Sequence, residues 1–264
     1  MPADKAVPTI ELMGLHIASL TRAAVVDHVF RALGQGRGGW IATVNLDYVR
    51  RCAAERETKR LYSGVDLMVA DGVPLLWAAR LRGTPLPDRV AGSDLVWLLA
   101  ERAAQEGRSL YLLGGNPGAA EAARAQIQAR WPELRIAGVS SPRVSDEPTG
   151  EELASLRSVI ERARPDLVYV ALGAPKQDRV VAALYPALAG TWWIGVGVSL
   201  SFMSGEIQRA PAWMQSVGLE WLHRLVQEPR RLAHRYLVED LPFAARLLAA
   251  SWRGRRASSG ARRG

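Results

Sequence analysis

One acidic side chain, that of Asp71, stands between two apolar runs. It follows LMVA at 67–70 and precedes Gly72 and a second apolar run that begins at Val73. At the end of a buried strand, a carboxylate can cap the helix that follows. It can also take a proton from a substrate hydroxyl, as a general base does. The sequence leaves both roles open and makes Asp71 the candidate catalytic residue.

Further polar residues and glycines follow other apolar runs of strand length. They are Thr43 and Asn45, then Gly114, Gly115 and Asn116, and then the segment 173–178. Thr43 and Asn45 either cap the next helix or contact a ligand. The sequence GGNP at 114–117 predicts a strand-to-helix turn in which Asn caps the helix and Pro opens it. The same turn can receive a phosphate at the helix N-terminus, and this second role remains open.

Residues typical of metal sites are few and scattered. The chain has four histidines and one cysteine, Cys52, and it contains no Asp-x-Asp motif. A sugar-nucleotide enzyme built on these residues has to stabilise its diphosphate leaving group with arginines and helix ends. We therefore expect neither a metal ion nor a cofactor.

The apolar runs alternate with helix-like segments along most of the chain. Predicted strands span 10–17, 40–44, 67–70, 109–114, 135–139, 167–172 and 192–197, and predicted helices span 21–33, 46–62, 93–106, 117–131, 150–163 and 176–188. Short continuous apolar runs are typical of parallel strands that helices cover on both faces. The predicted fold is an α/β, doubly wound, mostly parallel and Rossmann-like sheet over residues 8–212. Ligands of such sheets bind at the carboxyl ends of the strands, where the candidate residues occur.

The net charge of +8 is concentrated near the C-terminus. Residues 215–264 contain ten arginines and four acidic residues, together with many leucines and the tryptophans Trp221 and Trp252. Arginine mixed with leucine and tryptophan at helical spacing is typical of a surface that meets anionic lipid. We predict a basic, helical, membrane-associating appendage over 213–250 and a disordered basic tail over 251–264.

Composition sets the expected location. With 48% hydrophobic residues the 264-residue chain can bury a large core, and its single cysteine favours a reducing compartment. No apolar run reaches the roughly 20 residues that a membrane-spanning helix needs. We expect a cytoplasmic protein that associates peripherally with the inner face of the plasma membrane, and a homo-oligomer is possible.

Seven motifs occur in one order between residues 8 and 243. They are T-V-N at 43–45, A-D-G-V-P at 70–74, R-V-A-G-S-D at 89–94, Y-L-L-G-G at 111–115, L-G-A-P-K-Q-D at 172–178, R-A-P at 209–211 and G-L-E-W-L-H-R-L-V-Q-E-P-R-R-L at 218–232. As a set they resemble the WecG/TagA/CpsF family of glycosyltransferases, which elaborate lipid-linked precursors of bacterial polysaccharides such as teichoic acid. The chain departs from the family pattern at Asp178, Ser201 and His234.

The resemblance implies a reaction and roles for particular residues. It implies an inverting transfer of a sugar, most often N-acetylmannosamine, from a UDP-sugar to N-acetylglucosamine on undecaprenyl diphosphate, with Asp71 as the general base. It implies a pocket lined by Thr43, Asn45, Arg89 and Gln177, with Arg89 on a phosphate. It also implies that the C-terminal appendage docks on the membrane and that Arg224 and Arg231 face the diphosphate.

Three other functions compete with this one. A related enzyme of exopolysaccharide assembly would use a different UDP-hexose. A basic α/β module that binds nucleic acid would use the arginines on phosphates, but the C-terminal segment is as rich in leucine and tryptophan as in arginine. A nicotinamide or methyl-donor enzyme is disfavoured because the G-x-G-x-x-G fingerprint is broken. We therefore expect a UDP-sugar, a polyprenyl-diphosphate acceptor and a membrane surface as partners, and no nucleic acid.

Overall fold

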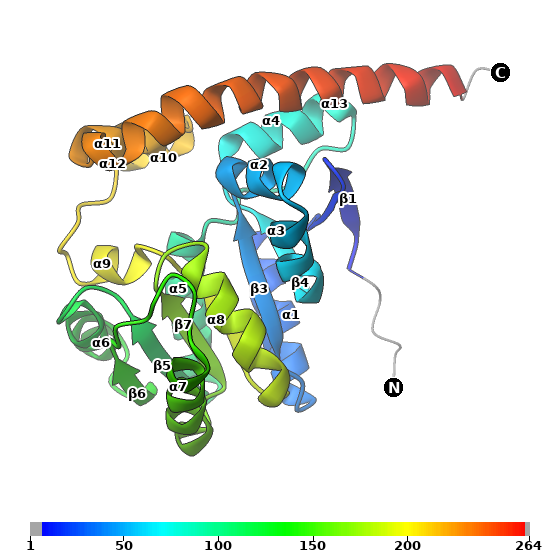
Figure 1. Cartoon of the computed structure of the whole chain (residues 1–264). Helices are drawn as coiled ribbons and strands as arrows, with labels where there is room; N and C mark the ends of the chain where they lie inside the picture. Colours follow the sequence, from blue (N-terminus) through cyan, green and yellow to red (C-terminus); the bar gives the residue numbers. More distant parts are fainter. Residues whose placement is uncertain (1–6, 262–264) are drawn as a thin grey trace.

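A parallel six-stranded sheet forms the centre of the molecule (Figure 1). The computed structural model describes residues 7–261, with the backbone alone for residue 216 and residues 256–261. The strand order is β4-β3-β8-β7-β5-β6, and every neighbouring pair runs parallel. The strands are β3 (Gly39–Val44), β4 (Leu67–Ala70), β5 (Ser109–Gly114), β6 (Arg135–Ser140), β7 (Leu167–Ala171) and β8 (Trp192–Gly195).

Helices cover both faces of this sheet. They are α1 (Arg22–Gly34), α2 (Leu46–Ala54), α3 (Arg56–Leu61), α4 (Val73–Arg82), α5 (Gly92–Gln105), α6 (Ala119–Arg130), α7 (Gly150–Ala163), α8 (Lys176–Leu184) and α9 (Ser199–Met203), with short 3-10 turns at Tyr62–Gly64 and Tyr185–Ala187. The buried side chains divide into two clusters, one on each face of the sheet. Leu110 and Leu112 pack with α1, α5 and α6, whereas Tyr111 and Leu113 pack with α2, α7 and α8. This alternation follows from the two-residue period of a strand and confirms the doubly wound α/β fold.

One predicted strand proves to be two. The run at 10–17 forms the antiparallel hairpin of β1 (Thr9–Leu12) and β2 (Leu15–Ala18), outside the central sheet. Met13 and Gly14 connect them, both with positive φ, as two-residue hairpin turns of this kind require. The continuous apolar run concealed this turn.

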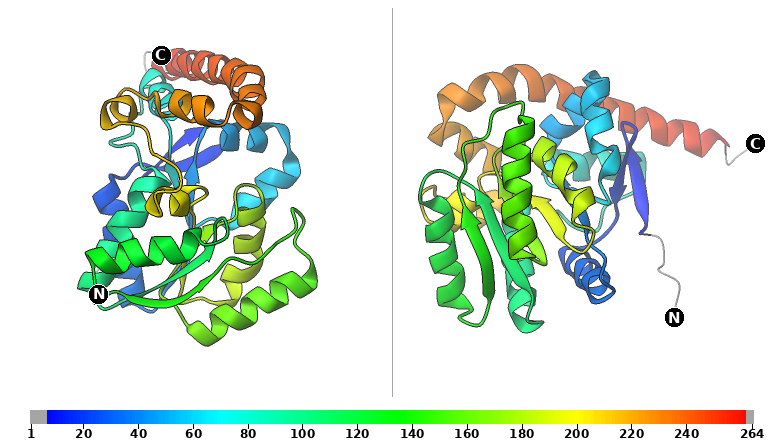
Figure 2. Two further views of the ribbon diagram at one scale, coloured as in Figure 1. Left: turned by 90° about the vertical axis from the view of Figure 1, so that its left-hand side faces the viewer. Right: turned by 60° about the horizontal axis from the view of Figure 1, so that its bottom comes forward.

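The C-terminal segment is helical and lies across one end of the α/β body (Figures 1 and 2). It contains α10 (Ala212–Ser216), α11 (Glu220–Gln227) and α12 (Pro229–Ala233), and α12 continues through a π-helical stretch, His234–Asp240, into α13 (Leu241–Ala261). Phe243 and Leu247 of α13 are buried in the cluster that contains α2 and α4. The predicted boundary at residue 251 falls inside α13, and residues 262–264 lie outside the described residues. The division into core, appendage and tail stays a prediction.

Between residues 7 and 261, no helix combines the length and the apolar character needed to cross a membrane.

Candidate active site

Asp71 lies directly after β4 and does not cap the next helix. Its backbone N–H donates to the carbonyl oxygen of Val44 at 2.7 Å, which extends the pairing of β3 and β4 by one residue. The N-cap of α4 is Gly72, whose φ of 140° suits glycine, and the helix has no side-chain cap. The capping role is therefore wrong for Asp71. Asp71 is partly exposed as a residue, and its carboxylate is left for other contacts.

The strand order brings Thr43 beside Asp71. β3, which carries Thr43, is the neighbour of β4, and both strands end at the same edge of the sheet. The loop that leads into α5 crosses this edge at Gly92. A Cβ added to Gly92 would stand 3.2 Å from Oγ1 of Thr43, so the loop backbone lies directly over the threonine.

Gln177 lies farther along the same edge, at the start of α8. Its Oε1 accepts a hydrogen bond of 3.0 Å from the backbone N–H of Gly197, just beyond β8. A Cβ on Gly195 would come within 2.7 Å of its Nε2, so glycine is required for this close approach. The buried amide therefore ties the loop after β7 to the end of β8, next to the strand of Thr43.

Asn45 has a structural role. It is the N-cap of α2, and its Oδ1 accepts a hydrogen bond of 3.0 Å from the backbone N–H of Tyr48. The capping interpretation is therefore confirmed for Asn45. Thr43 lies two residues earlier, inside β3, and is not the cap of this helix.

The turn at Gly114 and Gly115 differs from the predicted one. Both glycines have positive φ, and Gly115 donates its N–H to the carbonyl oxygen of Ala171 at 2.7 Å. Helix α6 begins only at Ala119, with Gly118 in the left-handed region as its N-cap and no side-chain cap. The prediction that Asn116 caps this helix and Pro117 opens it is wrong, because Gly118 adds an extra turn.

Asn116 instead contacts a distant part of the chain. Its Nδ2 donates to Oε1 of Glu206 at 2.5 Å, which connects the β5 turn to the segment after α9. Both side chains are exposed at this contact. Whether this turn receives a phosphate remains a prediction.

Arg89 belongs to a closed arrangement of four charged side chains, which we call the arginine–carboxylate ring. Arg89 contacts Glu220 at 3.1 Å and Asp94 at 3.8 Å. Arg209 contacts the same two carboxylates, Glu220 at 3.1 Å and Asp94 at 2.6 Å. Each arginine thus lies between two carboxylates, and each carboxylate lies between two arginines.

The sequence prediction included only Arg89 from this ring. Asp94, Arg209 and Glu220 nevertheless occur inside three of the seven motifs, R-V-A-G-S-D, R-A-P and G-L-E-W. Their presence in those motifs was the available signal. Arg89 and Glu220 are 131 positions apart, so their contact appears only in the fold.

The surroundings of Asp71 make it a stronger base than an ordinary aspartate. Burial, the largest influence, raises the pKa of Asp71 from its usual 3.8 to about 6. The positive charge of Arg89 and a hydrogen bond from the Gly92 backbone N–H lower this pKa, whereas the negative charges of Glu220 and Asp94 raise it. Asp71 is therefore ionised at neutral pH and still accepts a proton readily.

Arg224 and Arg231 meet each other at one carboxylate. Arg224 contacts Oε1 of Glu228 at 3.2 Å, and Arg231 contacts Oε2 of the same residue at 2.5 Å. The structure brings these two predicted residues together on α11 and α12. Within residues 7–261, no hydrogen bond or ion pair joins either of them to Asp71, Thr43 or Gln177.

The three departures from the family pattern have different environments. Asp178 is buried and accepts a hydrogen bond of 2.7 Å from the hydroxyl of Tyr62, and burial raises its pKa to about 6. Ser201 is buried in α9. His234 is exposed and lies 3.6 Å from Glu239.

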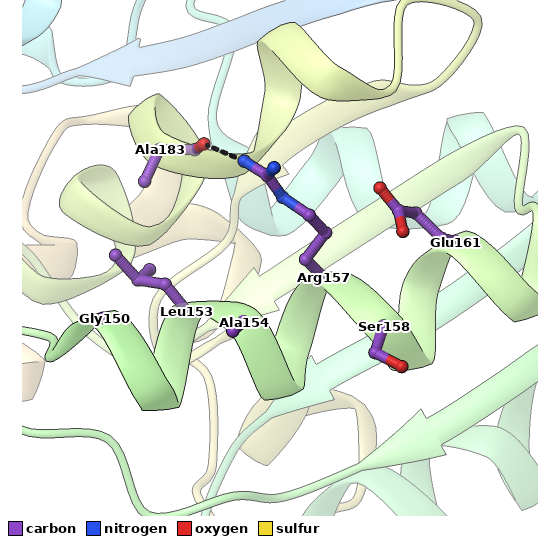
Figure 3. Close-up of a pocket in the computed structure, with 7 residues that line it drawn as sticks. All are labelled: Gly150, Leu153, Ala154, Arg157, Ser158, Glu161 and Ala183. Atoms are coloured by element: carbon purple, nitrogen blue, oxygen red, sulfur yellow. Dashed lines mark hydrogen bonds between the residues drawn. The ribbon is translucent and has the colours of Figure 1, made fainter.

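Two hollows lie on the surface away from the predicted site residues. One, of about 480 Å³, lies along α7 beside Ala183, whose carbonyl oxygen accepts a hydrogen bond of 3.5 Å from Arg157 (Figure 3). The second, of about 360 Å³, lies between the β1–β2 turn, α2 and α13. Neither is lined by a predicted site residue. Among the described residues, no group of three or more His, Cys, Asp or Glu side chains is arranged to hold a metal ion.

Fold and site together define an α/β protein. At the carboxyl edge of its parallel sheet it has a carboxylate with a raised pKa and a cluster of arginines. Such an edge is the binding site of nucleotide-dependent enzymes with doubly wound sheets. The chain belongs to the glycosyl transferase WecG/TagA/CpsF family, whose model matches residues 10–257. The predicted family and the predicted class, a glycosyltransferase, are therefore confirmed.

One curated relative covers most of the chain. It is the N-acetylglucosaminyldiphosphoundecaprenol N-acetyl-beta-D-mannosaminyltransferase of Bacillus subtilis (strain 168). The two proteins are 30% identical over 202 residues, which represent 75% of each chain.

Proposed function

We propose that this glycosyltransferase moves N-acetylmannosamine from UDP-N-acetylmannosamine to N-acetylglucosamine on a polyprenyl diphosphate, with inversion at the anomeric carbon. The name of the Bacillus subtilis relative supports the transferred sugar and the acceptor. The observation that carries the proposal is the ionised, uncapped carboxylate of Asp71, which lies beside Thr43 at the carboxyl edge of the sheet. The product belongs to a bacterial cell-surface polysaccharide.

The proposed reaction is a single displacement. The carboxylate of Asp71 accepts the proton of an acceptor hydroxyl while that oxygen forms a bond to the anomeric carbon of the donor. The bond between the anomeric carbon and the diphosphate oxygen breaks, and its electron pair leaves with UDP. Attack from the opposite side converts an α-linked donor into a β-linked product, which agrees with the beta linkage in the relative's name.

Negative charge develops on the diphosphate as it leaves. We assign its stabilisation to Arg89, Arg224 and Arg231, because guanidinium groups form charge-assisted hydrogen bonds to phosphate. Arg224 and Arg231 already share one carboxylate, that of Glu228, and can exchange it for a phosphate. This assignment needs no divalent cation.

The proposal includes a peripheral position at the inner face of the plasma membrane. A polyprenyl acceptor stays in the bilayer, because each buried CH₂ group is worth about 0.8 kcal/mol, and the enzyme must reach it there. The C-terminal segment exposes large apolar side chains alongside its arginines, as an interfacial helix does. These apolar residues are Trp213, Val217, Trp221, Leu222, Val226, Leu237, Val238, Leu241 and Trp252.

The test is a transfer assay with the purified full chain. A short-chain N-acetylglucosaminyl diphospholipid is the acceptor, and UDP-N-acetylmannosamine is compared with UDP-N-acetylglucosamine and UDP-glucose as donors. We expect product only with UDP-N-acetylmannosamine. Transfer from one of the other donors alone would overturn the proposed sugar, and no transfer from any of them would overturn the proposed reaction.

The role of Asp71 is tested in the same assay with Asp71→Asn. The amide has nearly the same size but cannot serve as a base, so turnover should fall about 10²- to 10⁴-fold while UDP binding persists. UDP binding is measured by calorimetry on the same preparation. Wild-type turnover in this variant would show that another group accepts the proton.

A further inference from the structure

The arginine–carboxylate ring joins parts of the chain that are far apart in sequence. Arg89 precedes α5, Asp94 lies in the first turn of α5, Arg209 lies between α9 and α10, and Glu220 begins α11. Their side chains are only 17–21% exposed, so solvent screens these ion pairs less than it screens surface pairs. The ring is therefore a defined structural feature at the junction of the α/β body and the C-terminal helices.

The ring lies against the backbone around Asp71. The N–H of Val90, the residue after Arg89, donates to the carbonyl oxygen of Ala70 at 2.8 Å. The N–H of Gly92, the first residue of α5, is hydrogen-bonded to the Asp71 carboxylate. The segment from Arg89 to the first turn of α5 thus holds Asp71 through its backbone and carries two members of the ring, Arg89 and Asp94, through its side chains.

Glu220 is the member of the ring that comes from the C-terminal helices. Its Oε2 contacts Arg89 and its Oε1 contacts Arg209, so both oxygens of one carboxylate are used. Without this charge, two guanidinium groups would share only Asp94, which also lies 3.5 Å from Arg22 of α1. Arg89 would then have less to fix its position beside the carboxylate of Asp71.

We propose that Glu220 is a positioning residue for the transfer reaction, because it bridges Arg89 and Arg209 and so holds Arg89 in place beside the catalytic Asp71. Glu220 touches neither substrate nor the reacting atoms in this scheme and acts through the two arginines. The inference rests on the proposed function, since it assigns Asp71 as the base. Asp94 has the matching role from the α/β body.

The charges that face Asp71 are those of Arg89, Glu220 and Asp94. Arg22 and Arg209 lie behind them and contact these carboxylates. Two effects follow from this arrangement. Removal of the Glu220 charge takes away a repulsion and leaves the attraction of Arg89, so Asp71 should hold its proton less tightly. It also frees Arg89 to move, which disturbs the geometry in which the substrates meet. Turnover and its pH dependence should change together.

The experiment compares Glu220→Gln with the wild-type chain in the transfer assay over a range of pH. The amide keeps the size of the side chain and removes only its charge. We expect turnover at neutral pH to fall about 10- to 100-fold, as a displaced catalytic neighbour commonly causes. We also expect the midpoint of the acid limb of kcat/KM to move to lower pH.

The matched control is Glu239→Gln. Glu239 also belongs to the C-terminal helices and forms an ion pair with the α/β body, at 2.8 Å from Arg50 of α2, but it lies outside the ring. This variant should keep the wild-type acid limb. The same shift in both variants would mean that general loosening of the C-terminal helices is responsible, and it would overturn the proposal.

A second variant removes a charge of the ring that belongs to the α/β body. If Glu220→Gln proves to be misfolded by circular dichroism, Asp94→Asn removes the corresponding charge from α5 and should shift the acid limb in the same direction. If the wild-type chain transfers sugar and a folded ring variant keeps the wild-type pH profile, the proposed role of Glu220 is overturned. Failure of the wild-type chain to transfer sugar would instead count against the proposed function.

Discussion

Asp71 and Asp178 show that two carboxyl groups can have similar pKa values and different roles. Burial raises the pKa of each to about 6. Asp178 is only 4% exposed and is satisfied by the hydroxyl of Tyr62, so it has little access to a ligand. Asp71 is partly exposed and caps no helix. The surroundings of each group, and not the pKa alone, favour Asp71 over Asp178 as the proposed proton acceptor.

The raised pKa of Asp71 determines how the reaction should depend on pH. A general base must be deprotonated, so kcat/KM should be constant at neutral pH and fall about tenfold per unit below pH 6. The measurement is a pH profile of initial rates at low donor concentration. Asp178→Asn is the control, because Tyr62 can still donate to the amide oxygen, and its acid limb should match that of the wild type. If Asp178→Asn lost the acid limb, that limb would report the titration of Asp178 and not that of Asp71.

The six strands of the central sheet could be predicted from sequence because each is a short, largely apolar run, largely buried in five of them and only partly buried in the edge strand β6. Their order could not, since it depends on where each crossover helix packs. The predicted strand at 10–17 was wrong for a local reason, a two-residue turn at Met13 and Gly14 within an apolar run. Asp71 and Thr43 could be placed at one edge because parallel strands end together. The arginine–carboxylate ring could not be predicted, because its members come from parts of the chain that are far apart in sequence.

Helix α13 is held on the α/β body by its apolar face, and its two sides should respond differently to mutation. Leu247 is 1% exposed within the cluster that contains α4, whereas Leu241 on the same helix is 60% exposed. Leu247→Ala should lower the free energy of unfolding by about 2–5 kcal/mol through the cavity that it leaves. Leu241→Ala should change it by less than about 0.5 kcal/mol. Urea denaturation of both variants measures the difference, and equal effects would contradict the observed packing.

The arrangement of the C-terminal helices agrees with the proposed reaction at a membrane surface. One side of these helices is buried on the α/β body through Phe243 and Leu247, and their first turn contributes Glu220 to the ring next to Asp71. Other positions expose large apolar side chains and arginines. A surface of this composition suits an anionic lipid interface. The same segment can therefore contact the bilayer and the catalytic edge.

Binding to lipid vesicles should separate the apolar and charged contributions of this surface. Trp213→Ser combined with Trp221→Ser removes two exposed rings and should weaken binding to vesicles that contain phosphatidylglycerol at low and high salt alike. Arg230→Gln removes an exposed charge on α12, worth about 1 kcal/mol near an anionic surface, and should weaken binding roughly fivefold at low salt only. Arg124→Gln changes another exposed arginine, on α6; it is the matched control and should bind as the wild type does. Co-sedimentation measures all three, and an equal loss for Arg124→Gln and Arg230→Gln would show that net charge, and not the C-terminal surface, directs the protein to the membrane.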